Sequence, residues 1–243
     1  PWEPGRGPGW RLLAAAQLGA DPTDPRLQAA ARVLLDEAPG GSGFALADGG
    51  PDRPWLTARV LEALAELGWR RHPRCEEALA WLEDEAPRGS RGGWLAGDGG
   101  TSCHVTPVAL LAALAVGGDG GRRALWGRAV DGALRVAVCA DPERRRLGHP
   151  NLGRSDAGEA LWVLARANVE LRPAMVPALG WLQGRQLDGG GWPRDIATPE
   201  IELPLGVAAP SRWLSLRCTV VTLRYAVAAG LPRMFPQRPV EPS

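Results

Sequence analysis

Cys103 and His104 form the sharpest candidate for chemistry in this sequence, because a thiol and an imidazole are adjacent at the predicted start of a helix. The positive end of the helix dipole favours the thiolate, the form of cysteine that acts as nucleophile or metal ligand. Two functional interpretations follow: a thiol nucleophile with an imidazole base, or a zinc site completed by Asp156 or His149. A buried cysteine beside a helix-capping histidine is the structural alternative. We expect no stoichiometric metal, because a zinc site needs at least three protein ligands and only this pair is well placed.

Asp156 and Glu159 are a second candidate, since residues three apart at a helix start place two carboxylates on one face. Such a pair suits acid–base chemistry or metal ligation. The alternative for Asp156 is ordinary stabilisation of the positive helix N-terminus. Glu159 is predicted to lie deeper and is the more interesting of the two.

Three tryptophans and two arginines recur at the start of predicted inner helices: Trp10, Trp55, Trp213, Arg59 and Arg217. Arginine follows tryptophan by four residues in two of these helices. Aromatic walls stabilise cations and bind apolar ligands, whereas inward arginines pair with diphosphate or carboxylate groups. The alternatives are packing within the repeat for the tryptophans and salt bridges between helices for the arginines.

The elements that must position these residues are all helices. Apolar residues recur at helical spacing, and Pro or capping residues begin the segments while Gly ends several of them. We predict helices over residues 10–18, 24–38, 54–68, 73–85, 103–116, 122–138, 156–168, 173–186 and 211–229. No segment alternates convincingly as a strand does, so the predicted fold is all-α.

A glycine-rich turn recurs between these helices. Residues 186–192 read Gln-Leu-Asp-Gly-Gly-Gly-Trp, and weaker copies end in Trp94 and in Phe44; Leu147-Gly148 is a degenerate further copy. A period of roughly 45–55 residues indicates a repeat architecture. The helices that follow the turns are the more apolar ones and are expected inside, and those at 73–85 and 173–186 outside.

These turns carry a family resemblance. Trp181-Leu182 followed by the turn at 186–192, and Trp81-Leu82 followed by Gly92-Gly93-Trp94, resemble the repeat of the prenyltransferase and squalene-cyclase superfamily, and within it short bacterial repeat proteins. The resemblance implies an α/α toroid whose inner helices surround a cavity.

The sequence departs from that family at its chemistry. It lacks both the Asp-x-Asp-Asp and the Asp-Asp-x-x-Asp motif, and Thr101 stands where the zinc-binding Asp of a protein prenyltransferase is expected, two residues before Cys103. Because a full toroid carries more hairpins, the ring is expected to be small, open or completed by another chain.

Composition sets the remaining bounds. The 243 residues suit one domain, here 1–230, followed by a Pro-rich tail at 231–243. Charges nearly balance, with 28 Arg and 27 acidic residues, so a nucleic-acid surface has little support. Four scattered cysteines without a CxxC fit buried thiols. Without a long apolar run, no transmembrane segment is predicted, and a cytoplasmic location is the default.

The predicted function is a terpenoid cyclase-like or prenyltransferase-like toroid with a cavity for an apolar, isoprenoid-like ligand and no predicted cofactor. A non-catalytic helical-repeat scaffold that binds protein or peptide on its rim is the alternative from another class. A polysaccharide lyase or glycosidase is a further alternative, which requires paired carboxylates across a groove. The long connection 193–210 is predicted to fold over the mouth of the ring as a lid.

Overall fold

A computed structural model describes residues 8–37, 41–45, 51–85, 94, 103–118, 121–151, 153–196, 211–226 and 228–230. This part of the chain is all-helical and forms no β-strand, which confirms the predicted all-α class. The helices are α1 (Pro8–Gln17), α2 (Pro25–Glu37), α3 (Pro54–Glu66), α4 (Pro73–Glu85), α5 (Val105–Gly117), α6 (Arg123–Ala137), α7 (Ala157–Arg166), α8 (Val176–Gly184) and α9 (Arg212–Val221), with short turns η3 (Pro173–Met175) and η4 (Thr222–Ala226).

The helix boundaries follow local chemistry. Pro54 opens α3, where its fixed φ suits the first turn and its missing N–H has no intrahelical partner to lose. Asp156 and Ser211 cap α7 and α9 by accepting hydrogen bonds from the N–H groups of Glu159 and Leu214. The last predicted helix changes character at residue 222, where the π-helical η4 continues α9.

The inner and outer assignment is confirmed for α3, α5, α4 and α8, but it is wrong for α9, which follows the Trp192 turn and buries only one face. Every residue from Leu56 to Ala65 of α3 and from Val105 to Leu114 of α5 is buried. The outer helices α4 and α8 bury only the few residues of one face. Such a difference is expected when a helix lies between neighbours rather than against solvent.

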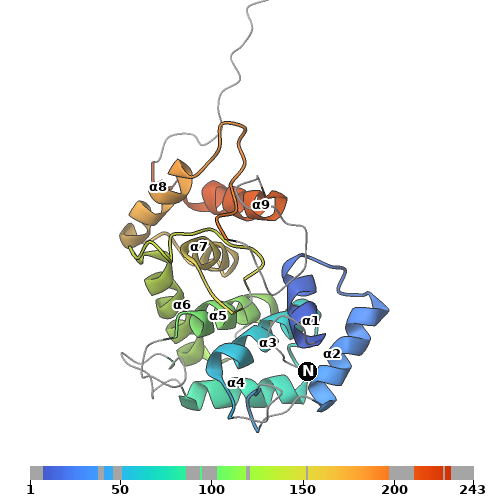
Figure 1. The fold of residues 1–243 in the computed structure, drawn as a ribbon. Helices are drawn as coiled ribbons and strands as arrows, with labels where there is room; N and C mark the ends of the chain where they lie inside the picture. Colours follow the sequence, from blue (N-terminus) through green and yellow to red (C-terminus); the bar gives the residue numbers. More distant parts are fainter. Residues whose placement is uncertain are drawn as a thin grey trace, which may run out of the picture.

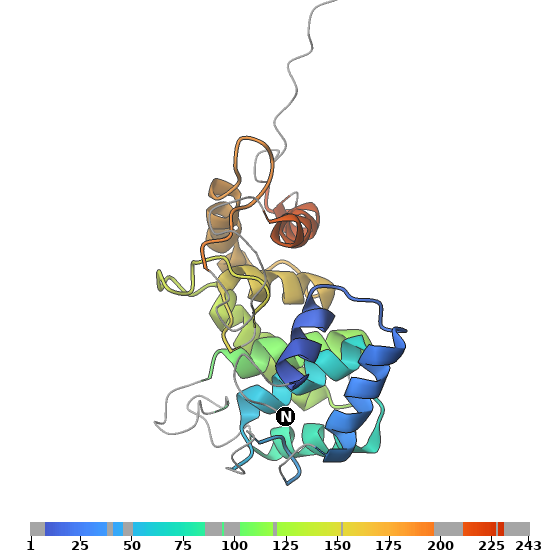
Figure 2. The ribbon, with the colours of Figure 1, turned by 45° about the vertical axis from the view of Figure 1, so that its right-hand side comes forward.

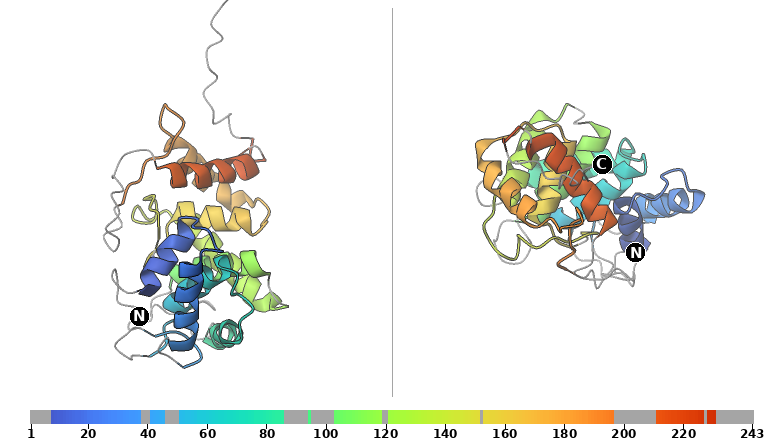
Figure 3. Two further views of the ribbon diagram at one scale, coloured as in Figure 1. Left: turned by 90° about the vertical axis from the view of Figure 1, so that its right-hand side faces the viewer. Right: turned by 90° about the horizontal axis from the view of Figure 1, so that it is seen from above.

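The inner helices stack in chain order. In Figures 1 and 2, α3 and α5 lie side by side above α4, and α7 lies above them. Figure 3 shows α9 as the last layer, across α7. The chain also returns on itself, because a Cβ on Gly19, just after α1, would lie 3.3 Å from the Trp213 ring of α9. A toroid around a cavity stays a prediction.

The tryptophans that end two of the glycine-rich turns make the same contact. The indole Nε1 of Trp94 donates to the Leu82 carbonyl of α4, and that of Trp192 donates to the Leu182 carbonyl of α8, each at 2.8 Å. Both indoles are buried, as is the Phe44 ring. The two indole contacts tie Trp94 and Trp192 to the outer helices that precede them.

Each of the three turns is also tied to the start of the helix that follows it. The carbonyls of Phe44, Trp94 and Trp192 accept hydrogen bonds from backbone N–H groups just before α3, α5 and α9. Gly43 is required because a Cβ there would lie 2.8 Å from the Trp81 ring. The repeated turn recognised in the sequence is therefore a fixed connection between one helix and the next.

Several predicted features lie outside the described residues: the glycine pair at 92–93, most of the predicted lid at 193–210, and the tail at 231–243. Within the described part, no helix has the length and apolar character needed to cross a membrane.

Candidate functional site

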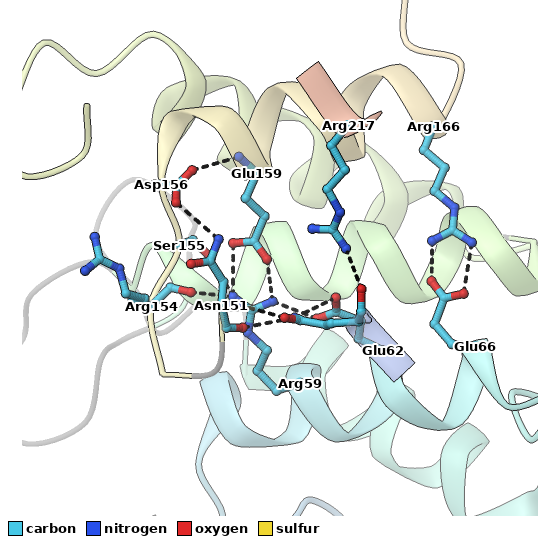
Figure 4. Close-up of polar contacts among 11 residues, drawn as sticks. Arg59, Glu62, Glu66, Asn151, Arg154, Ser155, Asp156, Glu159, Arg166 and Arg217 are labelled. Carbon is cyan, nitrogen blue, oxygen red and sulfur yellow. Dashed lines mark hydrogen bonds and ion pairs between the residues drawn. The ribbon is translucent and has the colours of Figure 1, made fainter. Parts of the chain in front are cut away.

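Charged side chains fill the space between α3 and α7, where a central ligand was expected. Arg59, fully buried on α3, donates from Nη1 to Glu62 Oε2 (2.7 Å) and to Glu159 Oε1 (2.8 Å) of α7. Its Nη2 donates to Glu159 Oε2 (3.1 Å), to Ser155 Oγ (3.0 Å) and to the Arg154 carbonyl. Figure 4 shows the guanidinium between the two carboxylates.

Gln17 at the end of α1 and Asn151 in the loop before α7 complete the site. Gln17 Nε2 donates to Glu62 Oε1 (3.1 Å) and to the Asn151 carbonyl (2.9 Å), and Gln17 Oε1 accepts from Asn151 N (2.7 Å). All of these groups are buried. We call Arg59, Glu62, Glu159, Gln17 and Asn151 the central cluster; it joins α1, α3 and α7.

Asp156 acts beside this cluster as a helix cap. Its Oδ1 accepts from Glu159 N (2.8 Å), and its Oδ2 accepts from Gly148 N (2.9 Å) and from Asn151 Nδ2 (3.2 Å). The structural alternative given for Asp156 is thus confirmed. Its carboxylate is directed back at its own helix, whereas that of Glu159 is directed at Arg59 (Figure 4).

Burial governs the protonation of these groups. It raises the pKa of Glu62, an effect that Arg59 opposes and Glu159 reinforces. Burial and the nearby Glu159 raise the pKa of Asp156 to about 6. Although burial opposes its charged form, Arg59 has a raised pKa because Glu159 and Glu62 stabilise the cation. The two glutamates are therefore held as partners of a permanent cation rather than as a free acid and base.

Arg217 of α9 approaches the cluster from the other side. Its Nη2 donates to the Gln17 carbonyl (3.3 Å), and its guanidinium lies 5.4 Å from the centre of the Trp162 ring. Burial lowers the pKa of Arg217, while Glu159 and Glu62 oppose that shift. Both predicted arginines thus contact groups of the protein itself. Arg59 forms the salt bridges of the structural alternative, whereas Arg217 donates to a backbone carbonyl.

Cys103 and His104 lie directly before α5 in the structure. Cys103 is buried, and its Sγ accepts from Thr106 Oγ1 (3.1 Å). His104 occupies the N-cap position of α5 without a side-chain capping bond, which corrects the capping role; burial and Arg144 lower its pKa.

No three His, Cys, Asp or Glu side chains of the described part are grouped closely enough to hold a metal ion. The zinc site with Asp156 or His149 is therefore not formed there. His149 is itself buried, and burial and Arg217 lower its pKa to about 2. All four cysteines are free, and all except Cys139 are buried.

The predicted aromatic wall is divided between two places. Trp10 and Trp55 stack on each other, with ring centres 6.1 Å apart, in the packing between α1 and α3. Trp213 is 39% exposed on α9. A depression of about 220 Å³ lies elsewhere, lined by Leu114, Ala115, Gly118, Trp126, Arg166, Ala167 and Asn168.

Sequence reasoning missed Glu62, Gln17 and Asn151. A signal for Glu62 was present, because Arg59 and Glu62 are a charged pair three residues apart inside an otherwise apolar inner helix. No local pattern marks Gln17 or Asn151, because these two residues contact each other across 134 positions of the chain.

Neither protein-family models nor curated proteins gave a match to this chain. The resemblance to the prenyltransferase and squalene-cyclase superfamily therefore remains a prediction based on the turns.

Proposed function

We propose that this chain is a non-catalytic helical-repeat protein that binds a protein or peptide on its surface. The observation that carries the proposal is the central cluster. Arg59 is held by two carboxylates, a hydroxyl and a backbone carbonyl, at the place where an isoprenoid-binding toroid needs open apolar space.

Energetics support a structural role for the cluster. Removing one partner of a buried ion pair typically costs about 3–5 kcal/mol, because the other charge is left without compensation. A ligand that entered between α3 and α7 would have to separate Arg59 of α3 from Glu159 of α7. An apolar chain offers no groups to replace those contacts.

The same contacts weigh against the enzymatic alternatives. Glu62 and Glu159 are paired carboxylates, as a glycosidase requires, but a buried guanidinium lies between them and no sugar oxygen can reach both. Asp156 is occupied by two backbone N–H groups and the Asn151 amide. A protonated carboxyl free to act on a substrate is not present in this arrangement.

A two-part experiment tests the proposal. Purified protein is incubated with farnesyl diphosphate, geranylgeranyl diphosphate, squalene and a panel of oligosaccharides, and products are sought by mass spectrometry. We expect no turnover and no ligand-dependent change in hydrogen exchange of α3 and α7.

In the second part, a fully random displayed peptide library is selected against the same protein, and we expect peptides that bind the folded chain. Product formation, protection of α3 and α7 by any of the small molecules, or failure to select a peptide would each refute the proposal.

A further inference from the structure

An apolar stripe is exposed on α9 and η4. Trp213, Leu216 and Leu223 are 39%, 56% and 60% exposed. Their spacing of three and seven residues places them on one side of the helix. The other large apolar side chains exposed in the described part, Val33 and Val116 among them, stand singly on different elements. Single exposed residues need no explanation, whereas a row of three on one helix does.

The opposite face of α9 is the one that packs into the protein. Leu214, Cys218 and Val221 are buried, and they belong to the hydrophobic core. Figure 3 shows α9 as the last layer, with no described helix on its outer side. Trp213 lies partly against Gly19 at the end of α1, and Leu216 and Leu223 extend the stripe on the side of α9 that no described helix covers.

The charged residues of the stripe's own segment are all positive. Arg212 and Arg224 are both exposed and lie at opposite ends of the stripe. The sequence from Ser211 to Gly230 contains no acidic residue. A complementary surface would carry apolar side chains at helical spacing with acidic residues beside them.

We propose that the α9–η4 stripe binds an acidic amphipathic helix of a partner protein; this inference rests on the proposed binding function and assigns it a surface. A second copy of the chain fits poorly, because antiparallel pairing of two α9 helices brings Arg212 of one copy near Arg224 of the other. A membrane surface also fits poorly, since three partly exposed apolar side chains and two arginines give little anchoring.

A helical peptide library tests the assignment. The displayed peptides are about 18 residues long, with leucine fixed at i, i+3, i+4 and i+7 and all other positions random. We expect the selected peptides to carry a clear acidic excess. Their affinity should fall about tenfold or more in Leu216→Glu and in Arg212→Glu/Arg224→Glu, and should weaken with salt.

Val33→Glu is the matched control, because Val33 is a similarly exposed apolar residue on α2. It should leave binding unchanged, and circular dichroism should show all variants folded, since the altered side chains face solvent. Selected peptides without an acidic excess, equal binding to Leu216→Glu, an equal loss in Val33→Glu, or no selected helix would overturn the assignment.

The two proposals can fail separately. If the fully random library yields binders while the helical library yields none that depend on Leu216, the binding function stands and the α9 assignment falls. Flotation with vesicles containing phosphatidylserine adds one outcome: vesicle binding that Leu216→Glu abolishes would overturn the protein partner in favour of a lipid surface.

Discussion

Replacing Arg59 by methionine should destabilise this protein far more than removal of an ordinary salt bridge. The guanidinium is fully buried and is bound by Glu62 and Glu159 at 2.7 and 2.8 Å. Methionine fills similar volume but leaves both carboxylates buried without their cation. We expect a loss of about 3–5 kcal/mol at pH 7, the usual cost of breaking a buried pair from one side.

This loss is measured by urea denaturation, followed by circular dichroism at 222 nm. With a urea dependence of about 3 kcal/mol per molar, the midpoint should fall by about 1–2 M. The loss should be smaller at pH 5 than at pH 7. Without Arg59, the pKa of Glu62, already raised by burial, rises further in the folded state, so acid supplies a proton that neutralises this carboxylate and restores part of the stability.

The chain offers a matched control in Arg166 and Glu66. This pair also joins α7 to α3, and Arg166 Nη2 donates to Glu66 Oε2 at 3.0 Å, but both side chains are partly exposed. Arg166→Met should cost only about 0–1 kcal/mol, because water screens the pair and solvates the remaining charge.

A triple variant separates the charge effect from packing. Arg59→Met combined with Glu62→Leu and Glu159→Met removes the two unpaired carboxylates, and it should recover part of the stability lost in the single variant; recovery is incomplete because buried Arg217 also loses these two carboxylates. An Arg59→Met loss no larger than that of Arg166→Met, or a triple variant less stable than the single one, would refute the explanation.

Three further predictions concern the cap and the turns. The raised pKa of Asp156, about 6, means that the folded state binds the Asp156 proton more tightly than the unfolded chain does. The stability that this proton contributes is therefore present at pH 4 and is lost as the pH rises to 7. Asp156→Asn should remove about 2 kcal/mol of this pH dependence, measured by denaturation at several pH values. Trp192→Phe keeps a buried ring but leaves a backbone carbonyl without its donor, and should lower the unfolding free energy by about 1–2 kcal/mol; an unchanged midpoint would contradict the proposed turn structure. Gly43→Ala places a Cβ 2.8 Å from the Trp81 ring and should destabilise by about 1–3 kcal/mol, whereas Gly127→Ala, inside α6 with open space around it, should stabilise by about 0.5–1 kcal/mol; equal thermal shifts would count against the clash.

Much of the fold was predictable because its signals are local. Helical periodicity, Pro at helix starts and Asp or Ser caps predicted each helix to within a few residues, as at Pro54 and Asp156. The recurrence of the glycine-rich turns correctly predicted that α3 and α5 lie inside, but not that α9, after the Trp192 turn, buries only one face. A buried helix must be apolar on most of its sides, and α3 and α5 have that composition.

The candidate site was predictable only in part. Arg59, Asp156 and Glu159 were singled out from their positions in inner helices; Arg59 and Glu159 meet in the central cluster, and Asp156 caps α7 beside it. Their roles were less accessible. The same carboxylate serves as an acid, a ligand or a counter-ion according to what lies across from it, and Glu159 lies opposite Arg59, exactly 100 positions away in the chain.

The sequence alone determined the class of fold, the positions of the helices and the turns that join outer to inner helices, since these depend on contacts between residues close in the chain. Only the tertiary structure decided that ion pairs fill the space between α3 and α7 and that Trp213 is partly exposed on α9. It also decided that the described residues bring no group of three metal ligands together at Cys103. Those outcomes depend on the packing of distant helices, because burial and the choice of partner set the charge and reactivity of each side chain.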